Sequence, residues 1–240
     1  MKFIPLLLLL ILFSCANEPR ERDLKNVKPG KLEFFETYSL SEILPSWQAA
    51  CKWIKDHDTL ALEGKVSMQE MDQRGLAALV QPNGEYMVGY VYEEDIPEVD
   101  KMLAMPEVKK NFFNDLRFLW SYGVEQEKNG RKMYALYATK IPREKKAKID
   151  GRHIVNAERG FNTQSKMNTI SITMTQDGAH DWEIMTRNNI GRAIAITLDD
   201  HVLSCPIVNN TISGGSTEIS GNFTVAKAEE LAARIYAGRK

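Results

Sequence analysis

A single cysteine near the start of the chain has the clearest predicted chemistry. Cys15 closes the tetrapeptide Leu-Phe-Ser-Cys at residues 12–15, in which an aliphatic and a small residue precede the thiol. Lys2 supplies a positive charge upstream, and residues 3–13 are an almost unbroken apolar run, too short to span a bilayer. The pattern predicts a lipoprotein signal peptide over residues 1–14 that is cleaved before a lipid-modified cysteine. An uncleaved anchor that happens to contain a cysteine is the alternative.

Acyl chains on Cys15 would bury about 0.8 kcal/mol per CH₂ group and hold the chain on a membrane. Residues 15–30 combine prolines, a glycine and charges with almost nothing to bury, which is typical of a flexible tether. We therefore expect a membrane-anchored lipoprotein of the cell envelope that faces the periplasm, with folded structure starting near residue 31.

No other residue pattern has catalytic or metal-binding spacing. The sequence contains no nucleophile elbow, phosphate loop or dinucleotide fingerprint. The four histidines lack the spacing of zinc ligands: His57, His153, His180 and His201. We predict no catalytic residue, no metal site and no cofactor, and hence a protein that is not an enzyme. A catalytic site assembled from scattered residues around His153 or His180 is a rival hypothesis.

Composition narrows the class of protein further. The chain has 240 residues, of which 43% are hydrophobic and 26% charged, with a net charge of -1. These values are typical of a folded globular protein. The near-neutral charge gives no indication of the basic patch that nucleic-acid binding needs. Three cysteines are too few for a disulfide framework. Cys51 falls on an apolar helical face and Cys205 in an apolar strand, so we predict buried, unreactive thiols.

Hydrophobic periodicity predicts mixed helices and strands. Ser41 is the expected N-cap of the first helix, and Thr224 of the last. Pro206 predicts either an edge strand or a bulge, and the strand around Cys205 is a candidate open edge. The expected strands are 31–38, 85–92, 116–122, 132–140, 169–175, 192–198 and 202–208, and the main expected helices begin near 40, 95, 177 and 224.

The C-terminal third resembles a known family. Residues 189–199, Asn-Ile-Gly-Arg-Ala-Ile-Ala-Ile-Thr-Leu-Asp, are similar to the N-V-G-R-x-hydrophobic-A-I-x-L-D segment of SecD. Residues 202–206 resemble its V-x-S-A-P segment, and residues 212–224 resemble I-x-G-G followed by I-S-G-x-F-T. Upstream, residues 32–38 are similar to the L-E-F-W-E-T-Y stretch of fused SecD–SecF chains. Order and spacing agree over about residues 31–238.

The resemblance implies the first periplasmic domain of SecD, an α+β fold with a ferredoxin-like base and an inserted, smaller α+β head. We expect the base over residues 31–140 and 224–238, and the head over residues 141–223. The signature positions are expected to be structural: Gly191, Asp199, Pro206, Gly214, Gly215, Ser220 and Gly221.

The sequence departs from the family pattern in ways that bear on function. A D-L-x-G-G segment and the family's membrane-helix bundle are missing from these 240 residues, and Asp200 stands where glycine is usual. The family couples movement of this domain to proton flow through its membrane helices. We therefore expect that this chain alone is not a proton-driven translocase.

Together these features predict a lipid-anchored protein that binds unfolded or translocating polypeptide, without catalysis, as an accessory to Sec-type export. The implied partners are secretory polypeptide, the Sec translocon and, through the lipid, a membrane, but not nucleic acid. Binding would use strand addition at an open edge or a groove between base and head. The sequence does not identify the polypeptide-binding residues. A docking, regulatory or structural lipoprotein that binds one folded envelope partner is the alternative.

Overall fold

The computed structural model describes residues 26–58, 67, 74–142, 144 and 146–239. The predicted signal peptide, Cys15 and most of the predicted tether lie outside the described residues. Within the described ranges the chain forms three sheets whose strand pairs are all antiparallel, with helices packed against them. The predicted α+β class is confirmed. The same ranges contain no helix of the length and apolarity needed to cross a membrane.

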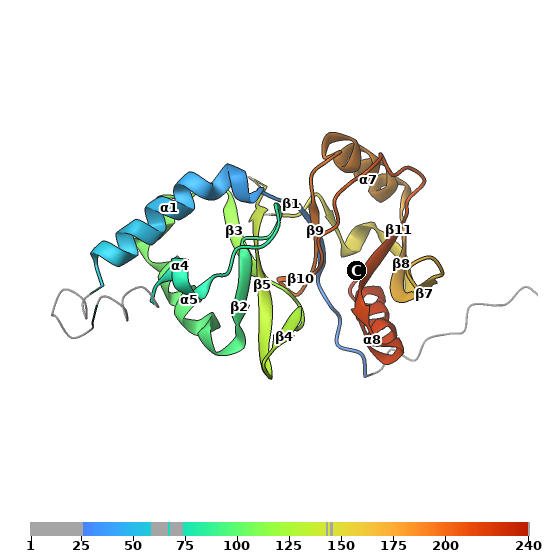
Figure 1. The fold of residues 1–240 in the computed structure, drawn as a ribbon. Coiled ribbons are helices and arrows are strands. Elements are labelled where there is room, and N and C mark those ends of the chain that lie inside the picture. Colours follow the sequence, from blue (N-terminus) through green and yellow to red (C-terminus); the bar gives the residue numbers. More distant parts are fainter. Residues whose placement is uncertain (1–25, 59–66, 68–73, 143, 145, 240) are drawn as a thin grey trace, which may run out of the picture.

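One part of the chain is a sheet with helices on one face, which we call the helix–sheet unit (Figure 1). Its central strand is β5 (Arg131–Lys140), flanked by β2 (Gly89–Tyr92), β3 (Leu116–Trp120) and the short β4 (Gln126–Lys128). The helices are α1 (Leu40–Asp56), α4 (Leu76–Leu79), α5 (Ile96–Ala104) and α6 (Pro106–Lys109), and a 3-10 turn at Glu93–Asp95 leads into α5.

Helix α1 forms because its apolar residues recur at helical spacing and its first turn is capped. Ile43 and Trp47 are buried against the sheet. The Ser39 hydroxyl accepts the Glu42 N–H at 3.2 Å, and the Glu42 carboxylate accepts the Ser39 N–H at 2.7 Å. This reciprocal capping box starts the helix, so the prediction of Ser41 as N-cap is wrong by two residues.

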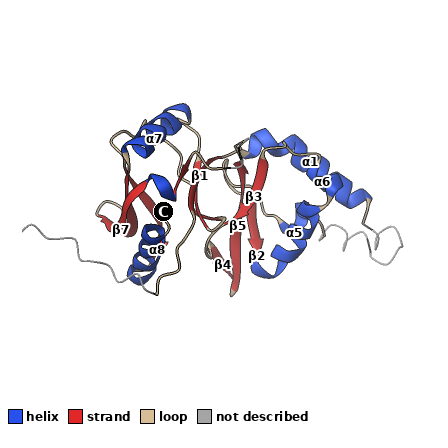
Figure 2. Ribbon diagram, turned by 180° about the vertical axis from the view of Figure 1, so that it is seen from behind, coloured by secondary structure: helices blue, strands red, loops and turns tan. Residues whose placement is uncertain are grey.

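The other part, the two-sheet unit, packs two sheets and two helices around one core (Figure 2). One sheet has the order β10-β9-β1-β6, and the other has the order β11-β8-β7. The strands are β1 (Leu32–Glu36), β6 (Ile149–Asp150), β7 (Ile154–Asn162), β8 (Met167–Met174), β9 (Ile194–Leu198), β10 (His201–Ser204) and β11 (Ser216–Phe223). The helices are α7 (Gln176–Asn188) and α8 (Val225–Ala237), with a 3-10 turn at Gly151–His153.

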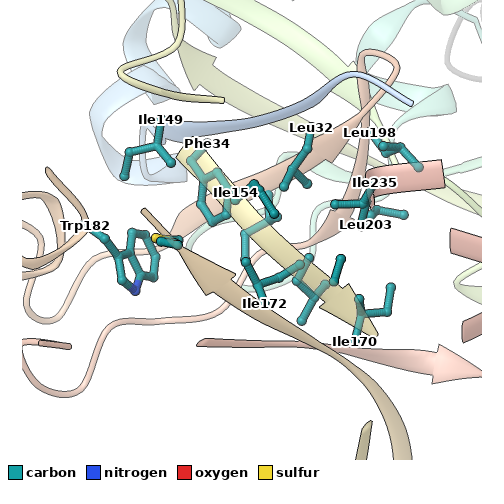
Figure 3. Packing of buried hydrophobic residues seen from close by; sticks show 14 of the residues in the cluster. Leu32, Phe34, Ile149, Ile154, Ile170, Ile172, Trp182, Leu198, Leu203 and Ile235 are labelled. Carbon is teal, nitrogen blue, oxygen red and sulfur yellow. The ribbon is translucent and has the colours of Figure 1, made fainter. Parts of the chain in front are cut away.

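The core of the two-sheet unit is apolar and fully enclosed (Figure 3). Phe34 of β1 packs edge-on against Trp182 of α7, with ring centroids 5.2 Å apart. Ile170 and Ile172 of β8 face this pair across the unit, and Ile235 of α8 closes one end. Each such side chain contributes about 1.5–3 kcal/mol when removed from water, so this core is a main source of the unit's stability.

The chain around β1 joins the two units, because β1 and the residues just after it pair with strands of both. One edge pairs with β9 along the whole of β1. On the other edge, Phe34 faces Ile149 of β6, and just beyond the strand Thr37 bridges to Thr139 of β5. A second link is the parallel bridge between Ser121 and Val202. The sheets of the two units are therefore connected by backbone contacts.

These contacts cross the expected boundary between base and head. β1, expected in the base, pairs with β9, expected in the head. Helix α8, also expected in the base, packs on β7 and β8. The division at residues 31–140, 141–223 and 224–238 stays a prediction, and the described packing groups the elements differently.

Candidate polypeptide-binding groove

The described residues contain no cluster of histidine, cysteine and acidic side chains that could hold a metal ion. His153 has a local partner, since its Nδ1 accepts the Asp150 N–H at 3.2 Å. His57 stacks on Trp53 with ring centroids 4.2 Å apart. These contacts fix each ring within its own turn or helix end.

The two described cysteines, Cys51 and Cys205, are partly buried rather than fully buried as predicted. Burial raises the pKa of the Cys51 thiol to about 11 and that of the Cys205 thiol to about 12. Both thiols are thus protonated at neutral pH, and a protonated thiol is a poor nucleophile.

A groove of about 1480 Å³ lies between the helix–sheet unit and the two-sheet unit. Its walls are the end of β1, the start of β3, the connection after β5 and the last turns of α7. Its apolar lining, which we call its floor, includes buried Phe35 and Met185 and half-buried Ile141 and Ile184. The groove therefore offers an apolar floor of the kind that accepts aliphatic or aromatic side chains.

The rim of the groove carries charges of both signs. The lining cations are Arg117, Lys140, Lys146 and Lys148, and the lining anions are Glu36, Asp115 and Glu144. A rim of this kind can pair with either sign of side chain on a bound ligand.

Tyr38 connects two of these rim charges. Its hydroxyl donates to Asp115 at 2.6 Å, and the Lys140 ammonium lies 4.7 Å from its ring centre. Burial, followed by the hydrogen bond to Asp115, raises the pKa of Tyr38 above its usual value. The hydroxyl therefore stays a donor at neutral pH and holds the Asp115 carboxylate in place.

An ion pair and hydrogen bonds hold the two units together beside the groove. Arg192 donates to the Glu42 carboxylate at 2.6 Å and to the Thr37 carbonyl at 3.2 Å. The Tyr86 hydroxyl donates to the Gly191 carbonyl at 2.7 Å. Burial pulls the pKa of Glu42 upward, but hydrogen bonds from Arg192 and Ser39 outweigh it, so the pKa lies below its usual value. Glu42 thus caps α1 and ties this helix to the two-sheet unit.

The signature residues lie at turns and strands of the two-sheet unit. Asp199 and Asp200 form the β9–β10 turn with φ of 50° and 64°. The Asp199 carboxylate accepts the Lys31 N–H at 2.8 Å and pairs with Arg234 of α8. Arg234 also donates to the Tyr122 hydroxyl at 2.6 Å. Asp199 therefore joins the turn, the start of β1 and α8.

The remaining signature residues have separate surroundings. Gly191, Gly214 and Gly215 adopt positive φ, and a Cβ on Gly215 would contact Ala179 of α7. The Pro206 carbonyl accepts the Ile194 N–H at 3.1 Å. Ser220 and Gly221 lie in β11 at a register shift against β8.

The candidate open edge near Cys205 is partly covered. The Tyr122 N–H donates to the Val202 carbonyl at 2.8 Å on the outer side of β10. The groove between the units was not identified residue by residue from the sequence. Its walls come from four segments that are separated in the sequence, so no single stretch of sequence identifies it.

Comparison with protein families matches residues 128–239 to the SecDF P1 head subdomain. The protein translocase subunit SecD of Rhodothermus marinus is 30% identical over 185 residues, which are 76% of this chain and 29% of that protein. The SecD of Rickettsia conorii is 38% identical over 94 residues, covering 39% of this chain and 18% of that protein. The chain thus spans less than a third of the length of either relative.

Two solved structures of SecDF are also similar. SecDF in the super-membrane-facing form has 18% identity and a TM-score of 0.37, covering 92% of this chain and 30% of that one. A structure described as a membrane component SecDF that enhances protein export has 20% identity and a TM-score of 0.36, covering 86% of this chain and 93% of that one.

Proposed function

We propose that the chain, whose residues 128–239 match the SecDF P1 head subdomain and which is similar to SecD, binds unfolded or translocating polypeptide as an accessory to Sec-type export. The observation that carries this proposal is the groove between the two units, with its apolar floor and its rim of mixed charge. An extended polypeptide presents both apolar and charged side chains. A groove with an apolar floor and charges of both signs at its rim can therefore accept many sequences.

The proposal includes anchoring through lipid on Cys15, with residues 16–30 as the tether. Anchoring would keep the domain at the periplasmic face of a membrane, where exported chains emerge. The Sec translocon is the proposed partner at that surface. No catalytic step belongs to this proposal, since capture needs only binding and release.

The test is binding of the purified chain to fluorescently labelled, unfolded secretory peptides, measured by anisotropy. Asn188 lines the groove at the exposed end of α7, so Asn188→Trp should obstruct the groove without touching the core. Gln176→Trp, at the other end of α7, is the matched control outside the lining residues. We expect binding that Asn188→Trp weakens and Gln176→Trp leaves intact. Absence of binding up to high micromolar concentration by the folded chain would refute the proposal.

A second candidate function is docking to one folded envelope protein. Two exposed aliphatic side chains favour it, because Ile190 and Ile207 are 54% and 52% exposed. Their segments are hydrogen-bonded to each other through Gly191 and Val208. Crosslinked pull-down from membranes distinguishes the functions: one stoichiometric folded partner favours docking, and a mixture of nascent envelope proteins favours capture.

A further inference from the structure

The outer edge of β3 has backbone groups without partners. The Ser121 N–H donates to Ala135 of β5 at 2.8 Å, and the Ile141 N–H donates to Asp115 at 2.6 Å. These two hydrogen bonds show that the backbone groups of Asp115 and Ser121 point toward β5. The register between these two residues has no shift. Since strand positions alternate, the N–H and C=O of Phe118 point to the opposite edge.

That edge has no backbone partner at Phe118, although Asp200 of the β9–β10 turn pairs with the neighbouring Arg117 side chain at 3.0 Å. The strand β10 lies beside β3 only near its C-terminal end, where Tyr122 bonds Val202. Among the residues that the structure describes, none forms a hydrogen bond with the Phe118 backbone on this side. Exposed edges of this kind accept an added strand.

A hollow of about 460 Å³, lined by both apolar and charged side chains, adjoins this edge. It lies between β3 and the helices, and Leu103, Phe112 and Phe118 line it. The Phe112 and Phe118 rings meet edge-to-face at 5.0 Å, which gives the hollow a firm wall. Phe113 at the rim is 47% exposed although its ring stacks on Tyr38 at 4.8 Å.

The hollow lies on the correct side for a residue of an added strand. Side chains directly opposite one another in paired strands lie on the same face of the sheet. A residue paired with Phe118 would therefore direct its side chain into the hollow that the Phe118 ring lines. The backbone groups and the hollow thus fit a single extended segment, whereas a bound helix could not satisfy the Phe118 N–H and C=O.

The hollow adjoins the groove between the units, because Asn114, Arg117 and Ile141 line both. We propose that an extended polypeptide adds as a strand beside β3 at Phe118, places an apolar side chain in this hollow and continues into the groove. This inference rests on the proposed function and specifies how the polypeptide is held: by backbone pairing at one end and by side-chain contacts at the other.

Ala104 provides the test on the protein side. It is exposed at the end of α5 and lines the hollow, so Ala104→Arg fills the hollow while leaving the core intact. The control is Ala49→Arg, at an exposed position of α1 that lines neither the hollow nor the groove. We expect Ala104→Arg to weaken binding of an apolar unfolded peptide about tenfold, the loss expected when one apolar anchor is excluded. Ala49→Arg should bind like the unmodified chain.

The peptide provides a second test that is specific for strand pairing. Each peptide of a series carries one N-methyl group, at a different backbone nitrogen. Methylation of the nitrogen that faces Phe118 should abolish binding, whereas methylation of either neighbouring nitrogen should leave binding intact. Full binding by Ala104→Arg, or equal tolerance of N-methylation at every position, overturns the inference while the proposed function stands. Failure of the unmodified chain to bind any unfolded peptide overturns both.

Discussion

Replacing Asp199 by alanine should destabilise the chain far more than the same change at its neighbour Asp200. The Asp199 carboxylate accepts the Lys31 N–H and pairs with Arg234, whose side chain is only 14% exposed. Asp200 also forms an ion pair, with Arg117 at 3.0 Å, but both of those side chains are substantially exposed. The two aspartates thus share a turn and differ in the burial of their partners.

The expected magnitudes follow from these contacts. Alanine at positive φ costs about 1 kcal/mol at either position, since both residues adopt the left-handed region. Loss of hydrogen bonds to a charged partner adds about 1.5–3 kcal/mol at Asp199, because water cannot replace the lost partner of the largely buried Arg234 guanidinium. An exposed ion pair adds only about 0–1 kcal/mol at Asp200. The difference between the two variants should therefore be about 2 kcal/mol, or roughly 4–8 °C in Tm.

Urea denaturation followed by tryptophan fluorescence and circular dichroism measures both variants at neutral pH. Asp199→Asn is a useful third variant, because asparagine tolerates positive φ and lacks only the charge. It should lie between the unmodified chain and Asp199→Ala. Equal destabilisation by Asp199→Ala and Asp200→Ala would refute the reasoning, since the cost would then come from the turn alone and not from the contact with α8.

Three further outcomes are expected. Glu42→Gln should lower stability by about 1 kcal/mol at pH 7. Since the folded-state pKa of Glu42 lies below its usual value, the difference should shrink as the pH falls below about 4.3, and it should be lost once the carboxyl is protonated in the folded chain, as urea titrations at a series of pH values will show. Cys205 should resist iodoacetamide at pH 8 in the folded chain and react in urea, because burial raises its pKa to about 12, and labelling followed by mass spectrometry checks this. Gly238→Ala should cost about 1–3 kcal/mol in urea, since its Cβ would overlap the Gly30 carbonyl, whereas Gly123→Ala, with open space around it, should be nearly neutral.

Local patterns predicted the elements that depend on local chemistry. The β9–β10 hairpin and the Thr224 cap of α8 were both readable, because the turn residues and the helical spacing lie within a few positions of each other. The N-cap at Ser39 was missed because Ser41 has the same side-chain chemistry, although Glu42 lies three residues after Ser39, the spacing of a capping box. Strand β7 was also missed, since its residues alternate only weakly between buried and exposed.

Long-range pairing could not be predicted from local patterns. Nothing in residues 32–36 indicates that β1 pairs with β9 on one edge and divides its other edge between β6 and β5. For the same reason the groove between the units had no sequence signature: its walls meet only after that pairing forms. The family resemblance supplied the expectation of a groove, and the geometry supplied its residues.

The position of β1 also bears on how the groove could change. Because β1 pairs with strands of the two-sheet unit and the residues just after it, Thr37 and Tyr38, bond to β5, a large separation of the units would break the Thr37–Thr139 bridge. The Arg192–Glu42 pair and the Tyr86–Gly191 bond would break with it. Those contacts lie on one side of the groove, and together they oppose free rotation between the units. A bound polypeptide would therefore meet a nearly preformed groove and lose little affinity to ordering of the protein.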